Sequence, residues 1–115
     1  SLQGFEGGAV TSTAAIYAAY GFFDTSDARV KTNVVEIDAS KADAVRLVEF
    51  DRTDKKHHGY GVIAQELEKV YPEMVNTDSE GFKSVNYNEL AMVKIKYLED
   101  KVARLEALVG RLLAE

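Results

Sequence analysis

Apolar residues in the C-terminal quarter of the chain recur in alternating steps of four and three positions. No proline interrupts the segment from Asn88, a suitable N-cap, to Glu115. A repeat sustained over several heptads is typical of a coiled coil, in which apolar residues occupy the a and d positions. The pattern therefore predicts a helix over residues 88–115 that associates with other copies through Ala91, Ile95, Leu98, Val102, Leu105, Val109 and Leu112.

Charged residues flank this apolar seam on both sides. With Ile95 at an a position, Lys94 and Lys101 are at g, and Glu99 and Glu106 are at e. Between parallel helices, each g lysine would face the e glutamate five residues later in the neighbouring chain.

β-Branched residues at a with leucine at d favour dimers, so the pattern alone predicts an oligomer without specifying a trimer. A helix that packs on its own domain is the alternative, although its apolar face is usually wider.

The segment before this helix predicts short strands and short helices. Residues 30–37 have the pattern of a strand, and Ser40 is a suitable N-cap for a short helix that reaches Leu47. Further strands are expected over residues 48–50, 59–63 and 82–85. A helix is expected from Ile63 to Met74, ended or bent by Pro72, and a turn over residues 76–81. Together with the long helix, these elements predict a small α+β fold.

Glycines are concentrated in the N-terminal segment, which contains Gly4, Gly7, Gly8 and Gly21. Most residues between 14 and 23 are small or aromatic, and none is charged. This composition suits the end of a β-structured stalk better than a free globular strand. We therefore expect three parts: an arm from an upstream stalk over residues 1–25, an α+β body over residues 26–87 and the C-terminal helix over residues 88–115.

Length and composition are those of a small, folded, acidic domain. The 115 residues carry a net charge of -5 and include no cysteine. Dispersed basic residues argue against a nucleic-acid partner, and no run approaches the ~20 apolar residues of a membrane span. A domain of this size buries only roughly two thirds of its unfolded surface, so oligomerisation would stabilise it. The chain begins at Ser1 without a secretory signal, so we expect it to be cut from a longer polypeptide.

Motifs for cofactor or metal chemistry are not evident in the sequence. There is no glycine-rich phosphate loop, zinc pattern or nucleophile elbow. His57 and His58 lie in a polar loop, and no acid has ligand spacing to them. We therefore expect no metal, no cofactor and no small-molecule substrate, which leaves the serines and lysines as candidates for chemistry.

Three segments of the chain resemble a known family. They are residues 25–34 (TSDARVKTNV), 60–75 (YGVIAQELEKVYPEMV) and 85–90 (VNYNEL). In this order, and followed by a coiled coil, they resemble the C-terminal intramolecular chaperone of phage endosialidases, tail fibres and neck appendages. The resemblance covers about residues 24–112. The same domain also occurs in membrane-anchored transcription factors of animals, so a phage origin is inferred from the stalk-like arm.

The resemblance implies both an assembly role and a self-cleaving activity. In that family the domain forms a homotrimer, guides the folding of an upstream β-stalk and is then released by autoproteolysis through a Ser-Lys dyad. Carried over to this sequence, the nucleophile is Ser26 and the base is Lys31. The expected setting is the precursor of a virion tail fibre or tailspike, assembled in the host cytoplasm.

The spacing of Ser26 and Lys31 does not by itself make a dyad. Five positions separate them by about 140° on an ideal helix and place them on opposite faces of an ideal strand. They can therefore meet only if residues 27–29 form a turn. A lysine base must also be neutral, which requires desolvation. On the predicted strand Lys31 shares a face with Val35 and Ile37, so we expect partial burial that subunit packing completes.

Ring size distinguishes the bonds that Ser26 could break. Its hydroxyl reaches the carbonyl of Thr25 through a five-membered ring, so cleavage between Thr25 and Ser26 is expected in cis. Attack across subunits could instead cut between Ser26 and Asp27.

Two alternatives involve no cleavage. One is a permanent trimeric tip, structural or receptor-binding, and the other is a generic coiled-coil module that needs only residues 88–115.

Overall fold

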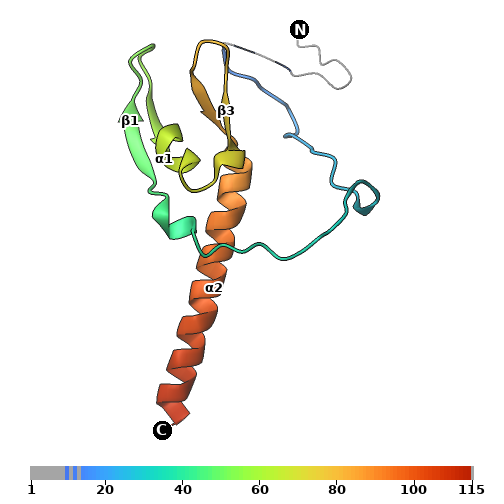
Figure 1. The fold of residues 1–115 in the computed structure, drawn as a ribbon, viewed down its shortest axis with the longest axis vertical. Coiled ribbons are helices and arrows are strands. Elements are labelled where there is room, and N and C mark those ends of the chain that lie inside the picture. The colour runs from blue at the N-terminus through green and yellow to red at the C-terminus, as the bar shows by residue number, and fades with distance from the viewer. Residues whose placement is uncertain (1–9, 11, 13, 115) are drawn as a thin grey trace. The chain divides into compact units, whose positions relative to one another are not determined.

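The computed structural model describes residues 10, 12 and 14–114 (Figure 1). The chain divides into two units, residues 1–34 and 35–115. Of the glycines in the predicted arm, Gly4, Gly7 and Gly8 lie outside the described residues. The predicted divisions after residues 25 and 87 stay predictions.

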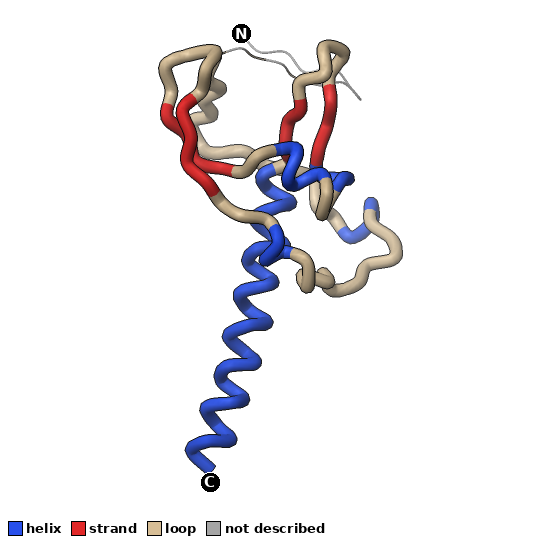
Figure 2. Tube along the Cα trace, turned by 60° about the vertical axis from the view of Figure 1, so that its left-hand side comes forward, coloured by secondary structure: helices blue, strands red, loops and turns tan. Residues whose placement is uncertain are grey.

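The second unit contains two short antiparallel hairpins, whose strands are red in Figure 2. Strand β1 (Val48–Asp51) pairs with β2 (His58–Gly61), and β3 (Val75–Thr77) pairs with β4 (Lys83–Val85). Between the hairpins lie α1 (Ala64–Glu68) and the 3-10 turn η3 (Pro72–Met74). A further 3-10 turn, η2 (Ala42–Ala44), precedes β1, and the long helix α2 (Tyr87–Ala114) ends the unit. The predicted α+β class, with small strands and a long C-terminal helix, is confirmed.

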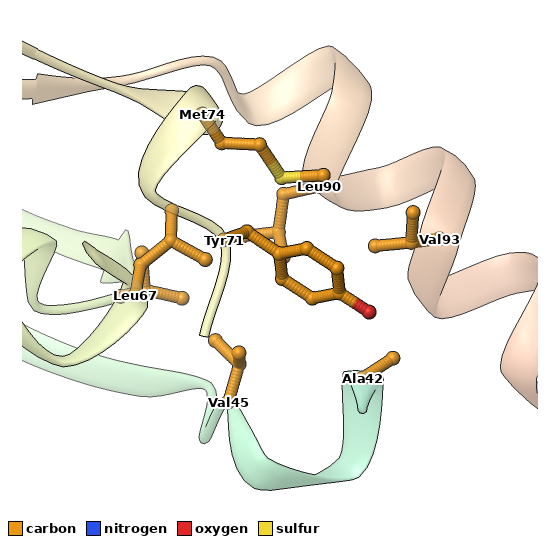
Figure 3. Close-up of a cluster of buried hydrophobic side chains, with 8 residues drawn as sticks. Ala42, Val45, Leu67, Tyr71, Met74, Leu90 and Val93 are labelled. Carbon is orange, nitrogen blue, oxygen red and sulfur yellow. The ribbon is translucent and has the colours of Figure 1, made fainter. Parts of the chain in front are cut away.

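A small apolar core holds these elements together (Figure 3). Leu67 of α1 and Val45, which follows η2, are fully buried at its centre. The first turns of α2 close the core with Leu90 and Val93. Burying a side chain of this size contributes about 1.5 to 3 kcal/mol, so a few such residues supply much of the stability of a small domain. The remaining buried members of the core are Ala42, Val62, Tyr71 and Met74.

Helix α2 begins at a different asparagine from the one predicted. The backbone N-H of Glu89 donates to Asn86 Oδ1 at 3.1 Å, and that of Leu90 donates to the Asn86 carbonyl oxygen at 3.1 Å. Asn86 is therefore the N-cap, and the expectation for Asn88 is wrong. The reason is tertiary, because the N-H of Asn86 donates to the Met74 carbonyl oxygen and fixes Asn86 at the end of the second hairpin.

The strand predicted over residues 30–37 is wrong. The chain instead forms the 3-10 turn η1 (Ala28–Val30) and continues without a strand. Asn33 adopts a left-handed φ of 53°, a conformation that interrupts an extended strand. Val35 is 84% exposed, so the apolar residues of this segment lack the packing that a strand would need.

Two predicted helices are shorter in the structure. The helix expected from Ser40 to Leu47 is the single turn η2, and the Ser40 N-H donates to Asp38 Oδ1 in a local turn. The helix expected from Ile63 to Met74 ends at Glu68, because Pro72 has no N-H for a further helical bond and its ring collides with the carbonyl four residues earlier. The segment after η3 then forms β3, where part of the turn over residues 76–81 was expected.

Candidate functional site

Ser26 and Lys31 lie on either side of η1. The Val30 N-H donates to the Asp27 carbonyl oxygen at 3.1 Å, and the Lys31 N-H donates to the Ala28 carbonyl oxygen at 3.2 Å. Asp27 caps this turn, because its Oδ1 accepts from the Arg29 N-H at 2.9 Å. A turn over residues 27–29 is therefore present, as a meeting of Ser26 and Lys31 requires.

The turn brings the two side chains into contact. Lys31 Nζ donates a hydrogen bond to Ser26 Oγ. A hydroxyl and an amine in this contact have the geometry of a nucleophile and its base, since a neutral amine could accept the hydroxyl proton along the same line. Thr25, whose carbonyl would be attacked, is exposed and outside regular structure. The catalytic roles of these residues stay predictions.

An ion pair beside the two side chains holds the turn. Arg29 Nε and Nη2 donate to Asp27 Oδ1 and Oδ2 at 3.0 and 2.9 Å. The side-chain hydrogen bond from Arg29 is the main reason that the pKa of Asp27 is lowered, so this carboxylate remains charged in mildly acidic solution. The Asp27 carboxylate thus pairs with Arg29, and Lys31 contacts Ser26.

The expected burial of Lys31 is not found in a single copy. Ser26 and Lys31 are both exposed, as are Val35 and Ile37, which were expected to cover the lysine. The physical reason is the missing strand, since only an extended run would align these three side chains on one face. One chain therefore assembles the pair without excluding water from it.

The predicted seam of α2 is unpartnered in one chain. Its large members, Ile95, Leu98, Val102, Leu105, Val109 and Leu112, are 51% to 69% exposed, and Ala91 is exposed as well. A different side of the same helix contacts the body through Leu90, Val93 and Tyr97. The first turns of α2 thus pack on their own domain through residues other than the a and d residues. The a and d residues stay exposed in one chain.

The two g lysines have contacts within the chain. Lys94 Nζ donates to the Val45 carbonyl oxygen, and Lys101 Nζ lies 5.8 Å from the centre of the Tyr97 ring. The predicted pairs with Glu99 and Glu106 would form between chains, and they stay predictions.

A polar cluster on the first hairpin was missed by the sequence analysis. His58 Nδ1 lies 2.7 Å from Asp51 Oδ1, and His58 Nε2 lies 2.8 Å from Glu49 Oε1. These hydrogen bonds, first that to Asp51 and then that to Glu49, raise the pKa of His58. The two acids are seven and nine positions from His58, and antiparallel pairing places Asp51 directly opposite it. Alternating acids in a strand before a histidine-containing strand could have signalled this cluster.

The described part of the chain contains no cluster of three or more His, Cys, Asp or Glu side chains that could hold a metal ion. Within residues 10, 12 and 14–114, no helix has both the length and the hydropathy needed to cross a membrane.

Comparison with known proteins bears on the segment that contains Ser26 and Lys31. Residues 26–76 match a family model that is named for a peptidase family and described as chaperone of endosialidase. A search of the curated proteins finds no match. The matched residues run from Ser26 through the first hairpin and α1 to β3, and they stop before α2. The resemblance recognised in the sequence is confirmed over residues 26–76, which are similar to the chaperone of endosialidase family.

Proposed function

We propose that this protein is an intramolecular chaperone that trimerises, directs the folding of a β-stalk upstream in its own polypeptide, and is then released by autoproteolysis at Ser26. The parent protein is a phage tail fibre or tailspike. The contact between Lys31 Nζ and Ser26 Oγ carries the proposal, since it occurs at the start of the segment that matches the family.

The cleavage is an acyl shift followed by hydrolysis. Ser26 Oγ attacks the carbonyl carbon of Thr25 while the neutral amine of Lys31 accepts the hydroxyl proton. The intermediate collapses by expelling the Ser26 nitrogen, which takes that proton from Lys31, and the Thr25 acyl group becomes an ester on Ser26 Oγ. Water hydrolyses the ester to a carboxylate at Thr25 and a free amine and hydroxyl at Ser26. Attack from a neighbouring subunit, cutting between Ser26 and Asp27, is the variant of this scheme in trans.

Assembly controls the cleavage in this proposal. Ser26 and Lys31 are in contact yet exposed, so the geometry exists in one chain and the dry environment does not. Packing of subunits around η1 would exclude water and favour the neutral amine that the reaction needs. The stalk is therefore released only after its chains have come together.

The seam of α2 supports the association of chains. A 28-residue helix that leaves a continuous apolar stripe in water gains free energy by burying it against other copies. The a and d residues alone favour two chains. We propose three, because residues 26–76 are similar to a family whose resemblance implies a homotrimer.

Intact mass spectrometry combined with analytical ultracentrifugation tests this function. The wild type should form a trimer and split into one fragment that ends at Thr25 and one that begins at Ser26. Ser26→Ala and Lys31→Ala should form the trimer and stay whole, whereas the matched control Ser40→Ala should split like the wild type. A trimer in which the wild type never splits would leave the permanent tip as the function. A wild type that remains monomeric would overturn both.

A further inference from the structure

An apolar groove lies between the first hairpin and α2. It has a volume of about 600 Å³ and lies within the second unit. Leu47 and Tyr60, on its hairpin side, are 68% and 77% exposed. So much uncovered apolar surface on a small domain marks a contact site. The residues used in the argument, which define the hairpin-helix groove, are Leu47, Tyr60, Tyr87, Ala91, Lys94 and Ile95.

The groove is continuous with the seam of the coiled coil. Ala91 and Ile95 are members of the heptad stripe, and both also line the groove. Tyr87 and Lys94, the other helix residues named here, are at g positions. The groove therefore opens on the g side of the seam, where a parallel coiled coil places the e side of the neighbouring helix.

Heptad register identifies the side chain that would meet the groove. A g residue faces the e residue five positions later in the neighbour, so Lys94 faces Glu99 of the next copy. By the same rule Tyr87 faces Met92 of the next copy. Met92 is 60% exposed in one chain, although the next two e residues, Glu99 and Glu106, are charged. In one chain this apolar e residue is therefore left mostly in water.

We propose that Met92 of a neighbouring copy inserts into the hairpin-helix groove of each chain. This inference rests on the proposed assembly of parallel chains and names a contact that the coiled coil alone does not require. Methionine suits the site because its unbranched side chain adapts to an irregular apolar groove. Lys94 Nζ donates to the Val45 carbonyl oxygen of its own chain, and its other N-H groups would pair with Glu99 of the same neighbour at the rim of the groove.

The contact would connect assembly to the structure of the body. The Val62 N-H donates to Tyr87 Oη at 3.2 Å, so Tyr87 already joins the end of the first hairpin to the start of α2. A methionine packed against Tyr87 from the next chain holds this junction in place. The neighbour thereby stabilises the domain body as well as the helix.

Disulfide cross-linking tests the contact, because the chain has no cysteine of its own. Leu47→Cys chains and Met92→Cys chains are co-expressed, oxidised and analysed on a denaturing gel without reductant. A covalent pair that contains one chain of each kind is expected. Leu105→Cys serves as the positive control, since it lies in the seam, and each cysteine variant expressed alone shows any pairing between like residues. Phe82→Cys replaces Met92→Cys in the negative control, because Phe82 is exposed and does not line the groove.

The outcomes separate this inference from the proposed function. A mixed pair of Leu47→Cys with Met92→Cys, absent when Phe82→Cys is used, supports the inference. A Leu105→Cys cross-link without the mixed pair overturns it and leaves the coiled-coil assembly standing. Loss of all cross-links, with a monomer in analytical ultracentrifugation, overturns both.

Discussion

Lys31 Nζ reaches Ser26 Oγ because one 3-10 turn, Ala28–Val30, reverses the chain between them. Neither an ideal helix nor an ideal strand would bring residues five positions apart into contact. Asp27 caps the turn by accepting from the Arg29 N-H, and the side chains of Asp27 and Arg29 pair with each other. The contact of Lys31 with Ser26 is thus a local property of residues 26–31, and both side chains are exposed in one chain.

Lys31→Arg should abolish self-cleavage even though the substituted side chain can still donate to Ser26 Oγ. A guanidinium stays protonated at all accessible pH values and therefore cannot act as the base. Intact mass spectrometry of the purified trimer over several days should show only the whole chain. Lys41→Arg, which makes the same change at another exposed lysine, should cleave like the wild type. Cleavage of Lys31→Arg at the wild-type rate would exclude Lys31 as the base.

Asp27→Ala should slow cleavage severalfold without dissociating the trimer. The substitution removes the cap of η1 and its pair with Arg29, so residues 26–31 sample other conformations and Ser26 meets Lys31 less often. The rate of fragment formation should be followed by mass spectrometry and the oligomer by analytical ultracentrifugation. Asp24→Ala is the matched control and should cleave normally. An unchanged rate for Asp27→Ala would show that the turn does not depend on its cap.

Leu105→Asn should weaken association more than Ala107→Asn. Leu105 is a d residue of the seam, and Ala107 lies at an outward f position of the same turn of α2. Placing an amide in an apolar seam should cost about 2 kcal/mol per subunit, so each subunit should contribute a factor of about 30 to the weakening of the assembly. Sedimentation equilibrium of both variants would measure the difference. Equal effects would mean that chains do not associate through the predicted seam.

Two glycine-to-alanine substitutions should have opposite effects on thermal stability. A Cβ at Gly61 would collide with Tyr87 Oη and lie 2.8 Å from Tyr87 Cζ, so Gly61→Ala should destabilise the protein by about 1 to 3 kcal/mol. A Cβ at Gly110 meets open space inside α2, so Gly110→Ala should stabilise it by about 0.5 to 1 kcal/mol. Thermal unfolding followed by circular dichroism measures both changes. A Gly61→Ala variant as stable as the wild type would show that Tyr87 moves away without loss.

The His58 cluster should make stability depend on pH. The folded protein raises the pKa of His58, so the charged histidine stabilises the hairpin below the unfolded value of about 6.5. That contribution is lost as the pH rises through the raised pKa. The Tm of the wild type should therefore exceed that of His58→Gln in mildly acidic solution, and the difference should shrink in alkaline solution. His57→Gln, which lies just before β2, is the control and should follow the wild type. A constant difference would exclude the charged cluster.

Several elements could be predicted because they depend on short sequence separations. The period of α2, the two strands around Phe50 and Tyr60, and the turn that allows Ser26 to meet Lys31 all depend on neighbouring residues. The strand over residues 30–37 was wrong because alternation does not supply a partner strand. The helix from Ile63 was too long because its apolar period continues past the point where Pro72 stops the hydrogen bonding.

Other features of the site depend on residues distant in sequence. The pattern of α2 does not distinguish the side that packs on its own body from the side that stays free, because both carry apolar residues. The buried side of α2 is set by tertiary packing. Leu90 and Val93 pack in the core with Val45, Leu67 and Tyr71, whereas Ile95 and Leu98 stay exposed. The contact of Lys94 with the Val45 carbonyl oxygen joins positions 49 residues apart and has no local signal.

The sequence by itself determined the long helix with its heptad repeat, the α+β class and the resemblance of residues 26–76 to the chaperone of endosialidase family. Each of these is encoded by period, composition or motif order. Only the tertiary structure decided that Lys31 is exposed, that Asp51 and Glu49 flank His58, and that a groove opens beside the seam. Those three features depend on which segments pack against one another, and packing depends on the burial of side chains from distant parts of the chain.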